Sequence, residues 1–331
     1  MRYARSHGLE DGGALAAQGQ TSYVAAYGGF SMDRVEIVEV GPRDGLQNLP
    51  AVVPVADRIA FANRLIAAGL KRIEIGSFVS PKAVPQMADT ASVVQAVERV
   101  PGLRLMALVP NARGAEDAIA AGLTELEFVL SVSDDHNRAN VRRTTAESIA
   151  ELRSVCAGID PERKLTMRFG LATSFHCPFA GRTEKARTLG VIEEVLAIRE
   201  DVEIALADTT GKAHPMQVQA LASEALARFG TSARFAFHGH DTSGFGIANV
   251  LAAYQAGIRI FDGAAAGLGG CPFAPGASGN TATEDIVNLF HGMGIDTGVN
   301  LPRLLEAADM AAGFPGAIPG SHIRLLPRQA A

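Results

Sequence analysis

Two histidines separated by one residue, His238 and His240, directly follow the strand-like run at 233–237. If that run is a β-strand, side chains two positions apart point to the same side, so both imidazoles can reach one cation. Two buried histidines side by side would otherwise each need hydrogen-bond partners. The pair alone is a weak indication, because most His-x-His pairs are surface or hydrogen-bonded histidines.

Two candidate oxygen ligands lie elsewhere in the chain. Asp44 belongs to the segment Gly-Pro-Arg-Asp-Gly at 41–45, and Asn280 follows a Ser-Gly pair. Each of them taken alone is typical of a turn. Together with the two histidines they form a mixed nitrogen and oxygen set, which suits Mg²⁺, Mn²⁺ or Co²⁺ better than structural zinc. We therefore expect one divalent metal, Mg²⁺ or Mn²⁺, that acts as a Lewis acid on substrate oxygens.

The segment 266–280 contains five glycines in fifteen residues and includes Cys271. Its spacing matches neither the dinucleotide-binding pattern Gly-x-Gly-x-x-Gly nor a P-loop. Glycine allows backbone conformations that other residues disfavour, so the segment could form a mobile lid that carries Cys271 over the metal. A flexible surface loop with an inert cysteine fits the same residues equally well.

These residues lie on a chain in which short strand-like runs alternate with longer stretches of helical spacing. Such alternation is typical of a parallel sheet covered by helices, and eight units favour a closed (β/α)₈ TIM barrel over an open sheet. The Gly-rich segment then follows the eighth strand, and the stretch 300–312 is an extra C-terminal helix. The strand-like runs are 35–40, 72–76, 104–109, 125–131, 164–168, 203–207, 234–237 and 259–262, and the helical stretches include 55–68, 144–157, 183–199, 215–228 and 242–256.

A parallel barrel places its chemistry at the carboxyl ends of its strands. Polar residues follow nearly every expected strand, which is costly unless a ligand or a hydrogen-bond partner is present. We therefore expect the functional site at this end of the barrel. The candidates are Arg43, Asp44, Gln47, Glu74, Ser77, Thr173, His176, Asp208, His238, His240, Cys271 and Asn280.

Composition limits the partners and the compartment. The 331 residues carry a net charge of -5, which provides no basic field for nucleic acid. No apolar run approaches the roughly 20 residues that a membrane helix needs. Three cysteines are too few for a disulfide framework and fit a reducing compartment, so we expect a cytoplasmic protein.

The beginning of the chain differs from the rest. Residues 1–32 are rich in glycine, alanine and glutamine, show no sustained period, and lack the apolar segment of a secretory signal. We expect a disordered extension there. One catalytic barrel domain at 33–315 and a short C-terminal tail at 316–331 would follow.

Several segments closely resemble 3-hydroxy-3-methylglutaryl-CoA lyases, which are metal-dependent TIM-barrel enzymes. The resemblance implies retro-Claisen cleavage of a 3-hydroxyacyl-CoA, namely of 3-hydroxy-3-methylglutaryl-CoA into acetyl-CoA and acetoacetate. A homo-oligomer, either a dimer or a tetramer, is also expected. The likeness runs from about residue 34 to about residue 312, and its motifs lie at 40–48, 77–82, 84–89, 240–242 and 267–280.

The resemblance also implies roles for individual residues. Arg43 would stabilise the enolate oxygen of the departing acetyl-CoA, and Cys271 would deliver a proton to the enolate carbon. The family's metal ligands correspond to Asp44, His238, His240 and Asn280. The remaining candidates are Glu74 and Asp208 as acidic site residues, His238 as a proton carrier, and Gln47, Ser77, Thr173 and His176 as substrate contacts.

Four positions depart from the family's familiar sequence and would shape the acyl pocket. Gly170 stands where an aromatic residue is usual, His176 is unexpected, Gly239 separates the two histidines, and Ser243 replaces a usual tyrosine. Because buried polar mismatches discriminate strongly between substrates, we expect an altered pocket, unless compensating residues restore the usual one. Cleavage of citramalyl-CoA into pyruvate and acetyl-CoA, or of a longer 3-hydroxyacyl-CoA, is the alternative.

Two other classes of protein share some of these features. A Claisen-condensing synthase has the same barrel and metal, but such enzymes usually carry more structure after the barrel. A metal-binding scaffold without catalysis would have no need for an arginine and a cysteine beside its ligands. We therefore expect a lyase.

Overall fold

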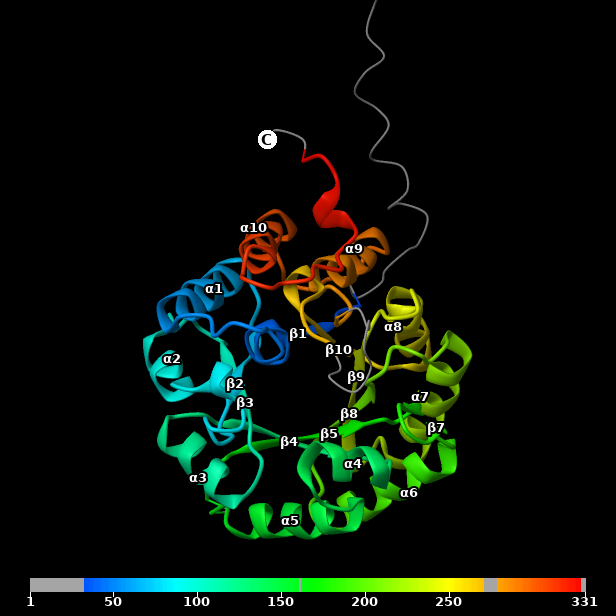
Figure 1. Ribbon diagram of the computed structural model, residues 1–331. Coiled ribbons are helices and arrows are strands. Elements are labelled where there is room, and N and C mark those ends of the chain that lie inside the picture. The colour runs from blue at the N-terminus through cyan, green and yellow to red at the C-terminus, as the bar shows by residue number, and fades with distance from the viewer. Residues whose placement is uncertain (1–32, 161, 271–278, 329–331) are drawn as a thin grey trace, which may run out of the picture. The chain divides into compact units, whose positions relative to one another are not determined.

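The computed structural model describes residues 33–160, 162–270 and 279–328, which form a closed parallel barrel surrounded by helices (Figure 1). Neighbouring strands follow the order β1-β10-β9-β8-β5-β4-β3-β2, so the expected TIM barrel is confirmed. The barrel strands are β1 (Glu36–Glu39), β2 (Arg72–Ser77), β3 (Arg104–Leu108), β4 (Glu125–Ser131), β5 (Thr166–Ala172), β8 (Val202–Asp208), β9 (Ala233–Gly239) and β10 (Ile260–Gly263).

The helices cover the outside of the barrel and bury one face each. Helix α1 buries Phe61, Leu65 and Ile66, which recur at helical spacing. Helix α5 begins with a capping box, in which the Thr144 hydroxyl accepts from the Glu147 amide at 3.0 Å. The outer helices are α1 (Val55–Ala67), α2 (Thr90–Ala96), α3 (Ala112–Ala120), α5 (Thr145–Ala157), α6 (Lys185–Leu196), α7 (Pro215–Phe229), α8 (Gly246–Ala256) and α9 (Thr283–Gly292), with α4 (Asp134–Val141) and α10 (Leu301–Ala312) in addition.

The main differences from the sequence-based expectation are two element boundaries and one additional hairpin. The strand expected at 164–168 runs to Ala172 instead, because β5 pairs with β4 up to that residue and with β8 up to Leu171. Hydrogen bonds on both sides thus keep the chain extended through a glycine that local propensity disfavours in a strand. Helix α8 begins at Gly246 rather than at 242. A small hairpin, β6 (His176–Cys177) with β7 (Gly181–Arg182), was not predicted.

The inside of the barrel is filled by buried charged side chains as well as apolar ones. Arg72 donates to Glu125 and to Glu203, each at 2.8 Å. Arg168 donates to the other oxygen of Glu203 at 3.0 Å and also binds Asp262. All five side chains are buried. Because both arginines meet carboxylates from other strands, most of them not adjacent, the ionic contacts tie together strands β2, β4, β5, β8 and β10.

The C-terminal tail is attached to the barrel. The Asp285 carboxylate on α9 accepts from the amides of His322 at 2.8 Å and Ile323 at 2.9 Å. The Gly320 amide donates to the carbonyl of Ala266, where the Gly-rich segment begins, at 2.9 Å. The tail therefore lies against both α9 and the root of that segment. A bilayer-spanning helix, which needs about 20 apolar residues, does not occur among the described residues.

We expect the substitution Arg168→Met to lower the free energy of unfolding by about 3–5 kcal/mol, because it leaves buried carboxylates without their cation. Urea denaturation followed by circular dichroism measures this change. The matched control is Arg228→Met on the surface, where the ion pairs with Glu193 and Glu224 are exposed and worth less than about 1 kcal/mol. Equal, small losses in the two variants would show that the interior ion pairs do not hold the barrel.

Candidate active site

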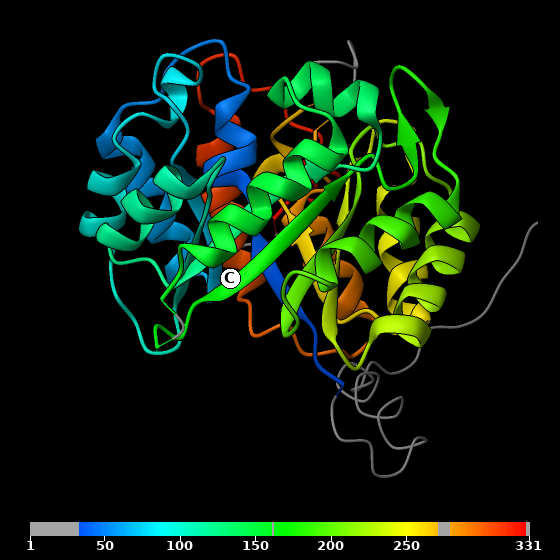
Figure 2. The same cartoon turned by 90° about the horizontal axis from the view of Figure 1, so that it is seen from below.

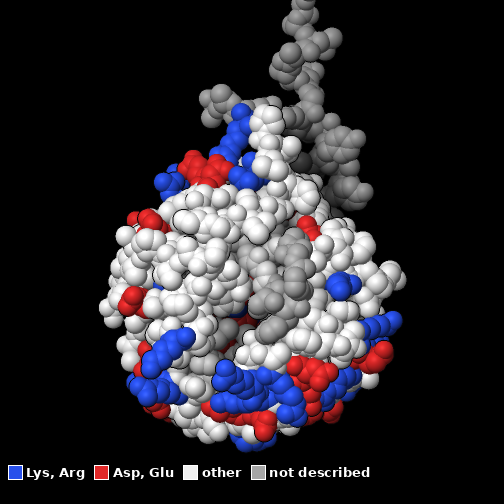
Figure 3. Space-filling model, in the orientation of Figure 1, with Lys and Arg blue, Asp and Glu red and all other residues white. Residues whose placement is uncertain are grey.

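A cavity of about 620 Å³ opens at the carboxyl ends of the barrel strands. Figure 3 shows this face hollowed near its centre, with acidic atoms visible at the bottom. Helix α4 lies at the same end as the β6–β7 hairpin (Figure 2) and contributes His136 and Asn140 to the cavity wall. Of the residues expected at the site, the lining contains Arg43, Asp44, Gln47, His238 and His240.

Arg43 and Asp44 are positioned by a short π-helix, Gly41–Gly45, that directly follows β1. The carbonyl of Val40 accepts from the amides of both Asp44, at 2.7 Å, and Gly45, at 3.4 Å. Single π-helical turns are rare and occur frequently at functional sites. A side chain at Gly41 would bring a Cβ within 2.5 Å of the Glu39 carboxylate, so glycine is required there. The glycine that begins the Gly-Pro-Arg-Asp-Gly segment is therefore explained by the close packing of the π-helix against Glu39.

Asp44, His238 and His240 form a cluster that could hold a metal ion. One ligand atom from each of the three lies within 4.8 Å of the others. Burial alone would raise the pKa of Asp44, but the Arg43 guanidinium and the two histidines lower it. Burial, together with the neighbouring His238, lowers the pKa of His240 to about 4. The site thus offers an anionic carboxylate and a neutral imidazole, which are the forms that bind cations.

Asn280 joins this cluster through a β-bridge with His240. Its amide nitrogen donates to the second carboxylate oxygen of Asp44 at 2.8 Å. Its carbonyl oxygen and Nδ1 of His240 are buried without a hydrogen-bond partner in the described part of the chain. Buried polar atoms without partners are costly, and a cation that accepts their lone pairs would remove that cost. The four expected ligands therefore fit a divalent metal.

Asp262 on β10 orients His238. Its carboxylate accepts from Nδ1 of His238 at 3.0 Å and is itself bound by Arg168. Nε2 of His238 is thereby left available as the metal ligand. Burial lowers the pKa of His238, but the hydrogen bond and the charge of Asp262 outweigh burial and raise it. Sequence analysis missed Asp262, although an aspartate inside an apolar strand run was a visible sign.

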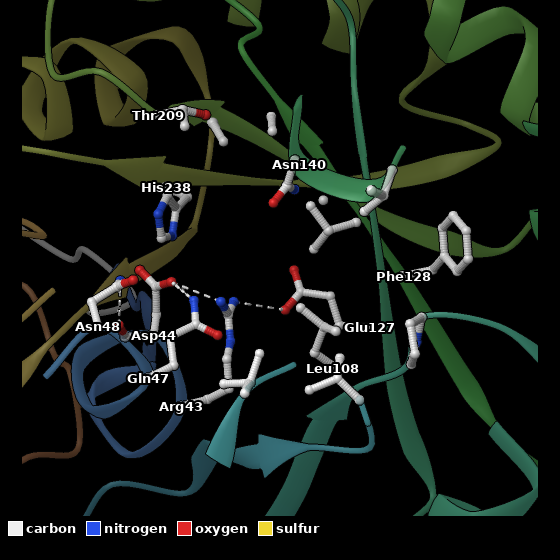
Figure 4. Close-up of a pocket in the computed structure, with 18 of the residues that line it drawn as sticks. Arg43, Asp44, Gln47, Asn48, Leu108, Glu127, Phe128, Asn140, Thr209 and His238 are labelled. Atoms are coloured by element: carbon white, nitrogen blue, oxygen red, sulfur yellow. Dashed lines mark hydrogen bonds and ion pairs between the residues drawn. The ribbon is translucent and has the colours of Figure 1, made fainter. Parts of the chain in front are cut away.

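Arg43 is held by three carboxylates, of which Figure 4 shows Asp44 and Glu127. Its guanidinium contacts Asp44 and Glu74, each at 2.7 Å, and lies 3.8 Å from Glu127. Burial and the neighbouring Glu127 raise the pKa of Glu74 well above its usual value, although Arg43 opposes this shift. The Gln47 amide donates to Asp44 at 3.0 Å. Glu127, which lines the cavity, was not among the residues expected from the sequence.

Comparison with known proteins agrees with this geometry. The HMGL-like family model matches residues 34–311. The chain is 47% identical to the (R)-citramalyl-CoA lyase of Chloroflexus aurantiacus over 297 residues, which cover 86% of this chain and 92% of that protein. It is 44% identical to the hydroxymethylglutaryl-CoA lyase of Bacillus subtilis over 282 residues, with coverages of 83% and 91%. The chain belongs to the HMGL-like family.

Solved structures show the same relationship for this HMGL-like protein. The crystal structure of a Bacillus subtilis HMG-CoA lyase matches with a TM-score of 0.83 at 40% identity, covering 88% of this chain and 97% of that chain. An HMG-CoA lyase of Acinetobacter baumannii, in complex with coenzyme A and 3-methylmalate, matches with a TM-score of 0.81 at 40% identity, with coverages of 88% and 94%. These relatives confirm the expected assignment of the chain to the carbon–carbon lyases.

Other residues expected at the site lie outside the cavity lining of the described chain. The Asp208 carboxylate accepts from the amides of Lys212 and Ala213, each at 3.1 Å, and burial raises its pKa to about 6. Ser77 is buried beside a separate recess near α2. Cys271 lies outside the described residues, and its expected place on a lid remains a prediction.

The two residues expected after strand β5 hold the loops around the cavity. The Thr173 hydroxyl accepts from the Ser133 amide at 3.2 Å, and the Thr173 backbone has a positive φ of 57°. His176 lies in the β6–β7 hairpin, with Nδ1 at 3.2 Å from the Thr210 hydroxyl. These contacts position the rim, and a direct substrate contact remains a prediction for both residues.

Glycine between the two histidines is required by packing. A Cβ at Gly239 would lie 2.8 Å from the ring of Phe237, which is fully buried. Since real Cβ contacts are not this short, any side chain would push β9 or the ring aside and displace both imidazoles. Gly239 therefore departs from the familiar sequence without opening the pocket.

We expect His240→Ala to weaken Mn²⁺ binding by ~100-fold or more, since even loss of a residue that supports a ligand costs about 10–100-fold. Isothermal titration calorimetry on the metal-free protein measures the dissociation constant. The control His214→Ala removes an exposed imidazole at the start of α7 and should leave the affinity unchanged. Unchanged Mn²⁺ affinity in the His240 variant would remove this residue from the ligand set.

Proposed function

We propose that this HMGL-like protein uses a divalent metal to cleave a 3-hydroxy-3-methylacyl-CoA that bears a terminal carboxylate, releasing acetyl-CoA. The supporting observation is Arg43 beside the Asp44–His238–His240 cluster in one cavity. 3-Hydroxy-3-methylglutaryl-CoA would give acetoacetate, and citramalyl-CoA would give pyruvate. The names of the two relatives and the coenzyme A bound in the Acinetobacter enzyme support this substrate class.

The reaction breaks the bond between C2 and C3 of the acyl group. The 3-hydroxyl loses its proton and becomes a ketone, and the electrons of the broken bond move onto the thioester as an enolate. C2 of the enolate then takes up one proton and becomes the methyl group of acetyl-CoA. A divalent metal held by Asp44, His238, His240 and Asn280 would supply Lewis acidity for the oxygen that develops negative charge.

Arg43 would stabilise the enolate oxygen. Its Nη2 is 3.8 Å from Glu127, which is too long for a hydrogen bond, so that N–H can donate to a substrate oxygen. The contacts to Asp44 and Glu74 fix the guanidinium before substrate arrives. A donor that is already oriented lowers the barrier without reorganisation during the reaction.

Several proton carriers are proposed on the sequence resemblance. Cys271 would deliver the proton to the enolate carbon, and His238 would move protons between substrate and solvent. Glu74 and Asp208 are the acidic residues of this set, and burial raises the pKa of both. We further propose Mg²⁺ or Mn²⁺ as the metal, a homo-oligomeric assembly, and a cytoplasmic location.

The variant Arg43→Lys should lower kcat by a factor on the order of 10²–10³, because lysine offers one flexible point charge in place of a rigid planar fork. Steady-state kinetics on the cleaved CoA ester and Mn²⁺ titration should show the loss of turnover with metal affinity retained. Arg138→Lys, on the exposed side of α4, is the control. Near-normal turnover of the Arg43 variant would show that this arginine is not the enolate partner.

A substrate panel under metal control tests the whole proposal. We expect the purified protein to release acetyl-CoA from one or both CoA esters. This activity should be lost on addition of EDTA and restored by excess Mg²⁺ or Mn²⁺. Acetyl-CoA mixed with a keto acid tests for net condensation by a synthase. Metal binding without any cleavage or condensation would contradict the lyase assignment.

A further inference from the structure

Glu127 on β4 places a buried carboxylate in the wall of the cavity. Its side chain points inward beside Arg43 (Figure 4), and the residue is only 5% exposed. One carboxylate oxygen lies 3.2 Å from Nε of Arg168, and the other lies 3.8 Å from Nη2 of Arg43. Neither the metal cluster nor the proposed enolate contact uses this group.

The neighbouring strand β5, and β8 beyond it, leave this carboxylate uncovered. A Cβ at Gly170 would lie 3.0 Å from the Glu127 carboxylate oxygen, so the missing side chain is what gives the acid its room. Strands β5 and β8 present only small residues to the cavity here, namely Gly170, Ala172, Ala205 and Ala207. Glu127 therefore borders space that an acyl group can enter.

Arg168 holds Glu127 in place at this wall through an ion pair of 3.2 Å. The surroundings also hold negative charge, because the carboxylates of Asp44 and Asp262 are buried nearby. A second carboxylate brought to this wall would meet like charge in a poorly solvated place, and such contacts are strongly unfavourable. This wall would therefore disfavour a substrate carboxylate.

The two candidate substrates differ in where they carry their carboxylate. In citramalyl-CoA it is attached to the hydroxyl-bearing carbon, whereas in 3-hydroxy-3-methylglutaryl-CoA one methylene separates the two. If the hydroxyl-bearing carbon binds beside Arg43 and the Asp44–His238–His240 cluster, a directly attached carboxylate would stay at the cluster. One additional methylene would carry the carboxylate further, toward the cavity wall. The remaining lining arginine, Arg143 on the rim, is paired with Glu151 at 3.2 Å within the described chain.

We propose that Glu127 is a specificity-determining residue that, together with Gly170, excludes acyl groups whose carboxylate is held one methylene away from the reacting carbon. This inference rests on the proposed lyase function and narrows its substrate to the malyl type, with the carboxylate on the hydroxyl-bearing carbon. The space beside Glu127 is then left for the uncharged alkyl substituent. Like-charge exclusion is a common means of building specificity into a site.

Equilibrium binding of two uncleavable thioesters tests this proposal without turnover. Succinyl-CoA and glutaryl-CoA lack the 3-hydroxyl and differ by one methylene. Calorimetry with and without Mn²⁺ should show that the unaltered protein binds succinyl-CoA more tightly by a factor on the order of ten. Glu127→Gln keeps the side-chain shape but removes the charge. It should abolish most of the preference for succinyl-CoA, because glutaryl-CoA should bind more tightly to this variant. Butyryl-CoA, which has no carboxylate, should bind equally to both proteins.

Glu125→Gln is the matched control. Glu125 lies two residues earlier on the same strand, is equally buried in ion pairs with Arg72 and Arg104, and does not line the cavity. Its variant should keep the succinyl preference, and thermal unfolding of both variants reports any loss of fold. The kcat/KM ratio of citramalyl-CoA to 3-hydroxy-3-methylglutaryl-CoA should follow the same order as the analogues.

Several results would overturn the proposal. The first is that the unaltered protein binds glutaryl-CoA as tightly as succinyl-CoA, or more tightly. The second is that Glu127→Gln keeps the preference for succinyl-CoA. The third is that Glu127→Gln cleaves both esters 10²-fold or more slowly while its analogue binding is unchanged. The last result would make Glu127 a catalytic group instead. The first result is measured on the unaltered protein, so the proposal can be tested even if the Glu127 variant fails to fold. Failure to cleave either ester would contradict the lyase function alone, because analogue binding is measured independently.

Discussion

Six buried carboxyl groups surround three buried arginines in the middle of this barrel and at its mouth. The acids are Asp44, Glu74, Glu125, Glu127, Glu203 and Asp262, and the arginines are Arg43, Arg72 and Arg168. Such groups are tolerated in a protein interior only when opposite charges and hydrogen bonds compensate for lost hydration. The contacts form one chain, from Arg72 through Glu203, Arg168 and Glu127 to Arg43. Excess acid remains at the end that bears the ligands, where a divalent cation would offset it.

This constraint joins the stability of the fold to the geometry of the site. Arg168 stabilises the barrel by pairing with Glu203, and it also fixes Asp262, which orients His238. Arg43 is held by the same kind of contact, so its guanidinium is immobilised before any substrate binds. A site supported by rigid strands and buried ion pairs keeps its donors in place, which is what electrostatic stabilisation of an enolate requires. Substitutions in the barrel interior should therefore affect catalysis through Arg168 and Asp262, which position His238.

Local sequence was sufficient for the barrel and for most of the candidate metal ligands. Apolar runs that alternate with helical spacing predicted the repeating strands and helices, and the residues at strand ends predicted the functional face. The His-x-His pair followed from the two-residue period of a strand, and the π-helical turn that carries Arg43 and Asp44 is encoded by Gly41 and its neighbours. Boundaries were less certain: β5 extends beyond its expected end because pairing with β4 and β8 overrides the weak strand propensity of Gly170.

Only the tertiary structure showed which charges meet. The sequence placed Asp262 and Glu127 in strand runs but could not give their partners, since periodicity gives the side of a strand on which a residue lies but not what it meets across the barrel. Their roles depend on Arg168, which lies 94 residues from Asp262 in the chain, and on the empty volume left by Gly170. The same reason brings Asn280 to Asp44 over 236 residues. The sequence alone determined the fold class and the types of the candidate ligands. Closure of the barrel decided which residues meet, because contacts across it arise from packing between distant strands and not from any local pattern.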